Sequence, residues 1–232
     1  MPGDEPIWDV LLSALRAGRP ALLGLTGSVA AGKTTFAEEF SRRLADRRVE
    51  IVSTDGFLLP TRTLSERGLL ERKGFPESYD LPRLTRFLGD VRAGRPALAP
   101  RYSHATYDPL PDVFGQAIER PDLLIVEGVN ALQPELRGFY DAALYLDATE
   151  ENLFSWYAAR LARIREEVKS DPAAYLHRLA KLSDDEFRER IARVWEETNL
   201  VNLREHIAPT RPFADLVIEK GSDHSLISVR KP

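Results

Sequence analysis

The feature that most constrains this chain is a glycine-rich stretch at residues 27–34, GSVAAGKT, which fits the pattern G-x-x-x-x-G-K-[ST]. Such a loop wraps a polyphosphate with backbone N–H groups, because its glycines allow a tight and partly left-handed path. The pattern assigns Lys33 to the β- and γ-phosphates and the hydroxyl of Thr34 to a Mg²⁺ ion. A chance match to four fixed positions occurs in about 1% of chains of this length, so the flanking sequence has to decide.

Both flanks of the loop have the patterns that a phosphate site needs. Residues 21–26 form a short apolar run typical of a buried parallel strand. After the loop, Phe36, Phe40 and Leu44 recur at helical spacing. A strand, a glycine loop and a helix in this order aim the helix N-terminus at a phosphate group. The sequence therefore predicts a nucleotide phosphate site.

Composition excludes several other classes of protein. A chain of 232 residues with 43% hydrophobic residues can form one large α/β domain over residues 1–232. The net charge of −4 lacks the basic surplus of a nucleic-acid binder, and the absence of cysteine excludes thiol chemistry and disulfides. No apolar run approaches the roughly 20 residues of a membrane span, and residues 1–25 lack a signal-peptide pattern. We expect a cytoplasmic protein with no membrane or nucleic-acid partner.

Apolar runs alternate with helical patterns along the chain, which implies a mostly parallel sheet flanked by helices on both faces. The sequence thus predicts an α/β fold with five strands in a mostly parallel sheet. The expected strands are residues 21–26, 49–54, 121–128, 142–147 and 215–219. The expected helices are residues 4–17, 35–46, 81–93, 149–169 and 184–204.

Two carboxylates lie at the carboxyl ends of predicted strands. In an open parallel sheet ligands bind beyond the carboxyl ends of the strands, so both side chains should face the crevice of the phosphate loop. Asp55 fits a general base that accepts the proton of an acceptor hydroxyl, although an aspartate that only caps a loop is the alternative. Glu127 occupies the place of the acidic residue that orients Mg²⁺. Its longer side chain favours a contact through a bound water.

Residues 60–120 are expected to form a lid or substrate-loop region within the domain. From residue 96 to residue 121 no clear periodicity appears, and a loop this long in a compact domain is usually a lid or a binding element. This region contains Tyr102 and His104, which with the intervening serine suit the binding of a polar substrate. On the helix at residues 149–169, Tyr157 and Arg160 are three apart and share a face. Arg160 is the arginine most suited to point into the site, the alternative being a solvated side chain. Asn199 lies on the last predicted helix.

Several of these segments resemble the bacterial type I pantothenate kinase family, in matching order from about Leu22 to the C-terminus. The resemblance is carried by residues 27–35, 53–57, 73–80 (KGFPESYD), 102–104, 124–130, 156–157, 171–172 with Tyr175, 180–182 and 209–211. It implies a phosphate-loop kinase fold and a kinase that uses ATP and Mg²⁺ to phosphorylate the primary hydroxyl of pantothenate to 4′-phosphopantothenate, the first step of coenzyme A biosynthesis.

The resemblance also implies roles for individual residues. Asp55 is the expected base, and Lys33 and Arg160 would stabilise the moving phosphoryl group, with Thr34 and Glu127 toward the metal. Residues expected at the nucleotide are Gly27, Ser28, Val29, Ala30, Ala31, Gly32, Lys33, Thr34, Thr35 and, near the adenine, His224. Residues expected at pantothenate or its phosphate are Tyr102, His104, Tyr157, Arg160 and Asn199.

This chain departs from the family in four respects, one of which is a shorter connection from Asn130 to Ala142. The region before the phosphate loop is shorter, and Leu161, Ile164 and Leu176 replace phenylalanines of the substrate channel. Glu38 replaces an arginine that in the family helps to hold the inhibitor coenzyme A, so the resemblance predicts weak or absent inhibition. The alternative is that Glu38 only pairs with Arg42, one helical turn away.

Two other functions remain open from the sequence. One is a kinase for a different hydroxylated metabolite, such as a nucleoside or glycerate. The other is a catalytically silent nucleotide-binding regulator, against which Asp55 and Glu127 argue because a regulator needs only the loop. The expected partner is a small-molecule substrate, and the sequence leaves a homodimer open.

Overall fold

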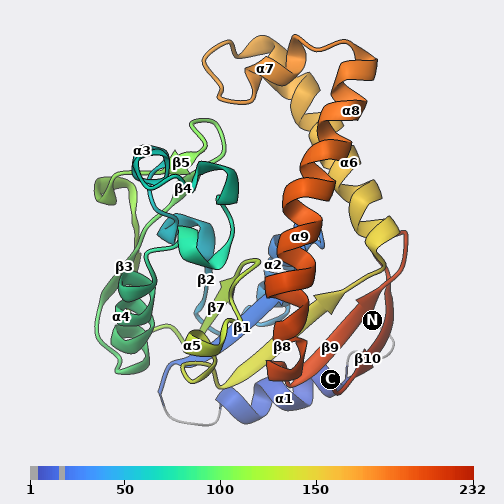
Figure 1. Cartoon of the computed structure of the whole chain (residues 1–232). Coiled ribbons are helices and arrows are strands. Elements are labelled where there is room, and N and C mark those ends of the chain that lie inside the picture. Colours follow the sequence, from blue (N-terminus) through green and yellow to red (C-terminus); the bar gives the residue numbers. More distant parts are fainter. Residues whose placement is uncertain (1–4, 16–18) are drawn as a thin grey trace.

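A six-stranded sheet is the centre of the computed structural model, which describes residues 5–15 and 19–232 (Figure 1). The strand order is β10-β9-β8-β1-β7-β2, with β10 antiparallel to β9 and the other neighbours parallel. The strands are β1 (Ala21–Gly27), β2 (Val49–Ser53), β7 (Leu123–Glu127), β8 (Ala142–Asp147), β9 (Leu216–Lys220) and β10 (Leu226–Arg230). The predicted α/β class and mostly parallel sheet are confirmed.

The predicted number of five strands is wrong, because β10 was not expected. This strand is a short run, LISVR, with serine and arginine among its apolar residues, and it lies half-exposed at the sheet edge. An edge strand needs no continuous apolar pattern, since only one neighbour and one face cover it. Its pairing with β9 depends on the turn at residues 221–225 and not on local composition.

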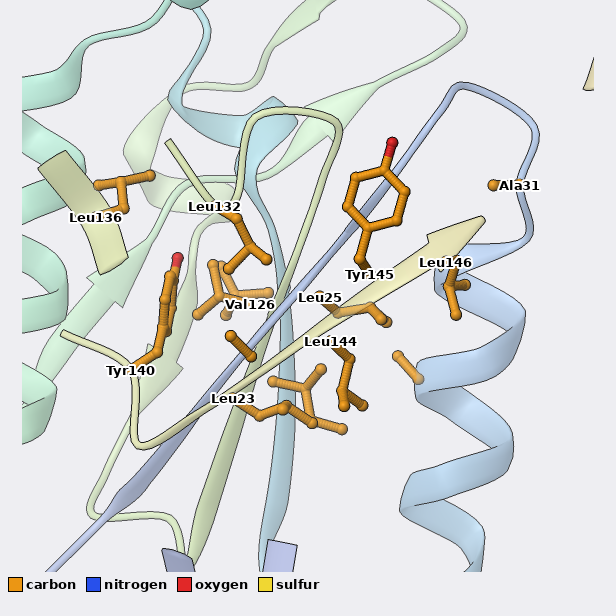
Figure 2. Packing of buried hydrophobic residues seen from close by; sticks show 14 of the residues in the cluster. Leu23, Leu25, Ala31, Val126, Leu132, Leu136, Tyr140, Leu144, Tyr145 and Leu146 are labelled. Atoms are coloured by element: carbon orange, nitrogen blue, oxygen red, sulfur yellow. The ribbon is translucent and has the colours of Figure 1, made fainter. Parts of the chain in front are cut away.

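Three central strands form the core of the molecule. Every residue of β1 and β7 is buried, as are all residues of β8 except Asp147. Figure 2 shows Leu144 and Leu146 of β8 on the side of the sheet that faces the helix after the phosphate loop, and Tyr145 on the opposite side. Strands covered on both faces require such continuous apolar runs, which is why the sequence predicted these strands.

Two helices at the start of the chain pack side by side on the sheet. These are α1 (Glu5–Leu15) and α2 (Lys33–Arg43), and Trp8 of α1 stacks on Phe40 of α2 with ring centroids 4.5 Å apart. The predicted helix at residues 4–17 is confirmed from 5 to 15, and its outermost positions lie outside the described residues.

The segment between β2 and β7 has more regular structure than the predicted lid. It contains α3 (Thr61–Glu66), α4 (Leu81–Arg92) and two small antiparallel sheets. Residues after 96 indeed show no periodicity, but the structure has four strands there. Each has only two or three residues, which is too short to produce a periodic pattern. They are β3 (Ala97–Ala99) paired with β6 (Gln116–Ile118), and β4 (Tyr102–Ser103) paired with β5 (Asp108–Pro109).

The C-terminal third supplies long helices that extend past the carboxyl-end edge of the sheet (Figure 1). The predicted last helix spans the expected residues, but it widens into π turns at Trp195–Asn199 and Leu203–Ile207. Such turns often mark functional sites. Within the described part of the chain, no helix is both long and apolar enough to cross a membrane. The remaining helices are α5 (Pro134–Arg137), α6 (Glu150–Glu167), α7 (His177–Ala180), α8 (Asp184–Val194) and α9 (Leu200–Asn202).

Candidate active site

The carboxyl ends of β1, β2 and β7 bring the predicted site residues to one edge of the sheet. In the strand register Glu127 lies beside Leu25 of β1 on one side and beside Ser53 of β2 on the other. The phosphate loop follows β1 directly, and Asp55 follows β2 within a 3₁₀ turn (Thr54–Phe57). Parallel pairing alone therefore places a loop, a glutamate and an aspartate next to one another.

The phosphate loop has the backbone conformation of an anion-binding site. Ala30 has φ 62° and Gly32 has φ 81°, so two of its residues are left-handed. A left-handed residue other than glycine is strained and is tolerated mainly at functional sites. Gly32 is the N-cap of α2 and provides no side-chain cap. The first N–H groups of α2 are thus left for a ligand.

Lys33 is folded back onto its own loop. Its buried ammonium donates to the carbonyl oxygens of Gly27 at 3.2 Å and Ser28 at 2.9 Å. Burial lowers the pKa of Lys33, and the negative charges of Glu127 and Asp55 oppose that shift. A phosphate that replaces the two carbonyl oxygens would supply the negative charge that this buried cation lacks.

Thr34 and Glu127 form a pair of oxygen ligands beside the loop. The hydroxyl of Thr34 donates to Oε1 of Glu127 at 3.2 Å. Burial raises the pKa of Glu127, although the charge of Lys33 lowers it in part. Carboxylate and hydroxyl oxygens are ligands that Mg²⁺ prefers, and a divalent cation would favour the ionised carboxylate. The residues present therefore fit a magnesium ion.

Two hydrogen bonds hold Asp55. Its N–H donates to the Ser53 hydroxyl at 3.3 Å, and the hydroxyl of buried Tyr79 donates to its Oδ1 at 3.4 Å. A Cβ on the next residue, Gly56, would lie 2.0 Å from the carbonyl oxygen of Pro100. Only glycine at this position lets the chain after β3 approach so closely, and this approach brings the strand of Tyr102 to the aspartate.

Aromatic rings form the acceptor side of the site. Tyr102 lies against His104 at 5.3 Å and against Tyr107 at 6.1 Å between ring centroids. Tyr107 stacks on Tyr175 at 4.7 Å with an interplanar angle of 3°, and the N–H of Tyr175 donates to the carbonyl of Ala105 at 2.8 Å. The hairpin of β4 and β5 is therefore joined to the segment that follows α6.

Lys73 is a buried cation on this side for which sequence patterns assigned no role. Its ammonium donates to the hydroxyl of Thr61 and to the carbonyl of Tyr107, and lies 3.6 Å from Oδ1 of Asp108. Burial lowers the pKa of Lys73, while Asp108 and Asp55 oppose the shift. The only available signal was its place in the KGFPESYD segment of the resemblance, since all three partners are distant in sequence.

Residues from the C-terminal helices complete this side. Arg160 lies within electrostatic reach of both halves of the site, because its charge lowers the pKa of Lys33 and that of His104. Burial is the larger cause of the lowered pKa of His104. Burial also raises the pKa of Tyr157 to about 12, although a side-chain hydrogen bond with Asn199 lowers it in part. The structure thus brings together the predicted acceptor-side residues.

His224 occupies a different place, at the turn between β9 and β10. Its ring stacks on Trp156 with centroids 4.0 Å apart, and the indole N–H of Trp156 donates to the carbonyl of Ser222 at 3.0 Å. Trp156 and Tyr157 are adjacent on α6 and so point in different directions. Among the contacts of the described residues, His224 touches none of the acceptor-side residues.

The residues that depart from the pantothenate kinase pattern lie at the margins. Leu161 and Leu176 are partly buried and pack against the core, and Ile164 is half-exposed. Glu38 is exposed on α2. On the same helix Glu39 forms an ion pair at 3.4 Å with Arg43, which is one turn further along. The expected alternative, a pair between Glu38 and Arg42, is absent from the ion pairs of the described residues.

Known proteins with the same arrangement are phosphate-loop kinases. Residues 22–201 match the model of the phosphoribulokinase/uridine kinase family. A putative fructose transport system kinase from Silicibacter sp. TM1040 has a TM-score of 0.70 at 22% identity, over 88% of this chain and 93% of that one. Phosphoribulokinase from Rhodobacter spheroides has a TM-score of 0.57 at 13% identity, over 87% and 70%. At such identities these structures show the fold alone.

Sequence relatives are much closer. A pantothenate kinase of Rhodopseudomonas palustris (strain HaA2) is 44% identical over 234 aligned positions, which cover 94% of this chain and 73% of the relative. A pantothenate kinase of Rhizobium etli (strain CIAT 652) is 44% identical, over 91% and 69%. The chain therefore belongs to the phosphoribulokinase/uridine kinase family and, within it, to the bacterial pantothenate kinases.

Proposed function

We propose that this chain transfers the γ-phosphoryl group of ATP to the primary hydroxyl of pantothenate, which yields 4′-phosphopantothenate and ADP. This reaction is the first step of coenzyme A biosynthesis. The observation that carries the proposal is the meeting of the phosphate loop, Glu127 and Asp55 at one edge of the sheet, where Thr34 donates to Glu127 and the charges of Asp55 and Arg160 both affect the pKa of Lys33. Membership among the pantothenate kinases supports the choice of acceptor.

Each side of the site has one task in this reaction. The N–H groups of the loop bind the β- and γ-phosphates, and Lys33 leaves its carbonyl partners to reach the transferred group. Arg160 stabilises the charge of that group from the acceptor side. Thr34 and Glu127 are the residues that would hold Mg²⁺, which when bound would supply positive charge to neutralise the phosphates. His224 is proposed at the adenine.

Asp55 takes the proton of the pantothenate hydroxyl. As the bond between the γ-phosphorus and the ADP oxygen breaks, a bond forms to the pantothenate hydroxyl oxygen and its proton passes to the carboxylate. Tyr79 donates to the carboxylate and keeps it oriented. The polar groups that hold the acceptor are those of Tyr102, His104, Tyr157, Arg160 and Asn199.

The experiment is phosphorylation of a panel of hydroxyl compounds by the purified chain with ATP and Mg²⁺, followed by mass spectrometry of the products. We expect 4′-phosphopantothenate from pantothenate and no product from uridine or D-glycerate. The Lys33→Ala variant controls for contaminating kinases. Phosphorylation of another compound but not of pantothenate would favour a different kinase, and ATP binding without any transfer would favour a regulator.

A further inference from the structure

A lysine from the far end of the chain holds the phosphate loop from outside. The ammonium of Lys220, the last residue of β9, donates to the carbonyl oxygen of Ala31 at 3.1 Å. Lys220 and Ala31 are 189 positions apart in the sequence. Three other loop carbonyls have donors that are close in sequence. Lys33 donates to Gly27 and Ser28, and the N–H of Phe36 donates to Gly32 at 2.9 Å.

This contact fixes the direction of one particular N–H group. The peptide between Ala31 and Gly32 is trans, since the described residues contain no cis bonds. In a planar trans peptide the C=O and N–H bonds point in opposite directions. A donor that binds the carbonyl of Ala31 on the outside therefore turns the N–H of Gly32 toward the inside, where a phosphate would lie.

The second glycine of the loop fits the same arrangement. A Cβ on Gly32 would lie 2.9 Å from Nζ of Lys220, so any side chain would displace the ammonium. Gly32 also has φ 81°, which a residue with a side chain rarely adopts. Lys220 thus uses the space that glycine leaves open.

Lys220 is itself held in place. It ends a strand paired on both sides, to β8 and β10, and its ammonium lies 5.9 Å from the centroid of the Trp156 ring. It is half-buried, and burial lowers its pKa, an effect that the charge of Glu39 opposes. A half-buried lysine with a carbonyl partner has little freedom to move.

We propose that Lys220 is a positioning residue that orients the N–H of Gly32 toward the phosphates of the bound nucleotide. The inference rests on the proposed function, because it concerns the same nucleotide site. It assigns Lys220 a larger effect on phosphate binding than on binding of the nucleoside part, although Lys220 also lies near the Trp156 ring on which His224 stacks. This division separates it from a residue that contacts the base.

The test compares binding of ADP, pyrophosphate and adenosine to the unaltered chain and to Lys220→Met by calorimetry. Lost alignment of one N–H to a charged phosphate should weaken ADP and pyrophosphate about tenfold, raise KM for ATP similarly, leave KM for pantothenate unchanged and change adenosine affinity less. Unchanged ADP affinity, or an equal loss for adenosine, would overturn the proposal. Binding of ADP to the unaltered chain separately tests the nucleotide site itself.

Two further variants keep the test decisive. Lys220→Gln retains a donor but no charge, so it should recover most of the ADP affinity if orientation is the role. A loss as large as that of Lys220→Met would show direct attraction between charges instead. Lys231→Met, on the same hairpin and exposed, is the matched control and should bind all three compounds like the unaltered chain.

Discussion

The two edges of the central sheet treat their charged residues in opposite ways. At the amino-end edge, an aspartate directly precedes β7, β8 and β9, and each carboxylate accepts an N–H from a neighbouring chain segment. The N–H of Arg48 donates to Asp122 at 2.8 Å, and the N–H of Leu22 donates to Asp141 at 3.0 Å. The N–H of Ala143 donates to Asp215 at 2.8 Å. This edge repeats one device that joins strands.

At that edge, arginine side chains also donate hydrogen bonds to two of these aspartates. Arg19 donates to Asp141 at 2.9 Å, and Arg137 donates to Asp215 at 3.2 Å. Burial alone would raise the pKa of Asp141, but the hydrogen bonds from Arg19 and Leu22 and the arginine charges hold it below its usual value. The ionised form therefore stabilises the fold.

At the carboxyl-end edge the shifts have the reverse sign. Burial lowers the pKa of Lys33 and raises that of Glu127, so each charged form is disfavoured by its surroundings. Charges with opposite charges and hydrogen bonds around them stabilise the sheet, whereas buried charges without enough such partners are typical of ligand-binding sites. The comparison predicts that substitutions at one edge affect activity and at the other affect stability.

The largest expected effect is that of Lys33→Ala. Phosphoryl transfer should fall below detection, because the variant loses the cation nearest the transferred group. The thermal unfolding temperature should stay the same or rise, because a desolvated charge is removed. Both are measured by a coupled ADP assay and by calorimetry. Full activity with unaltered melting would remove the basis for the phosphate site.

Asp55→Asn should have the next largest effect. The variant keeps the shape and the hydrogen bond from Tyr79 but loses the proton acceptor, so kcat should fall about 10²–10⁴-fold. ATP affinity, measured by calorimetry, should be nearly unchanged. A parallel collapse of ATP binding would instead make Asp55 a metal or structural residue.

Asp141→Asn tests the other edge. We expect a loss of about 2 kcal/mol of unfolding free energy at neutral pH, since the variant weakens charge-assisted hydrogen bonds, with kcat unchanged. The folded-state pKa of Asp141 lies below its unfolded value of 3.8. This stability is therefore present above pH 3.8 and is lost as pH falls through the lowered pKa.

Denaturation of both proteins between pH 3 and pH 8 measures this difference. Asp46→Asn is the matched control, because its carboxylate is exposed and its ion pair to Arg47 is long, at 3.4 Å. A difference between the unaltered chain and Asp141→Asn that did not decrease as the pH fell below 3.8, or a large loss of kcat, would break the distinction between the edges.

The sequence predicted those parts of the site that are contiguous or follow a strand. Residues 27–34 act together because they are neighbours in the chain. Glu127 was found because it ends a strand, and Asp55 because it follows one closely. Their assigned roles stay predictions, but the edge of the sheet where they meet could be deduced from apolar runs alone.

What could not be predicted depends on contacts between distant segments. Lys220 reaches Ala31 across 189 positions, and Lys73 contacts a carbonyl 34 residues away. Neither lysine belongs to a local pattern. The π turns around Asn199 were missed because a widened helix keeps the same composition, and its extra residue is accommodated by packing.

Glu38→Arg should have the smallest effect, and it tests whether an exposed charge on α2, outside the carboxyl-end edge, affects binding of a phosphate-bearing inhibitor. The exposed carboxylate of Glu38 repels phosphates near α2, so we expect coenzyme A to inhibit the unaltered chain weakly or not at all. An exposed ion pair contributes at most about 1 kcal/mol. The variant should therefore strengthen inhibition by about fivefold at most, measured as the coenzyme A concentration for half-inhibition at fixed ATP. Glu38→Gln, which only removes the repulsion, should show a smaller shift, and salt should reduce both. Potent, ATP-competitive inhibition of the unaltered chain would mean that other cations bind the effector despite the charge of Glu38.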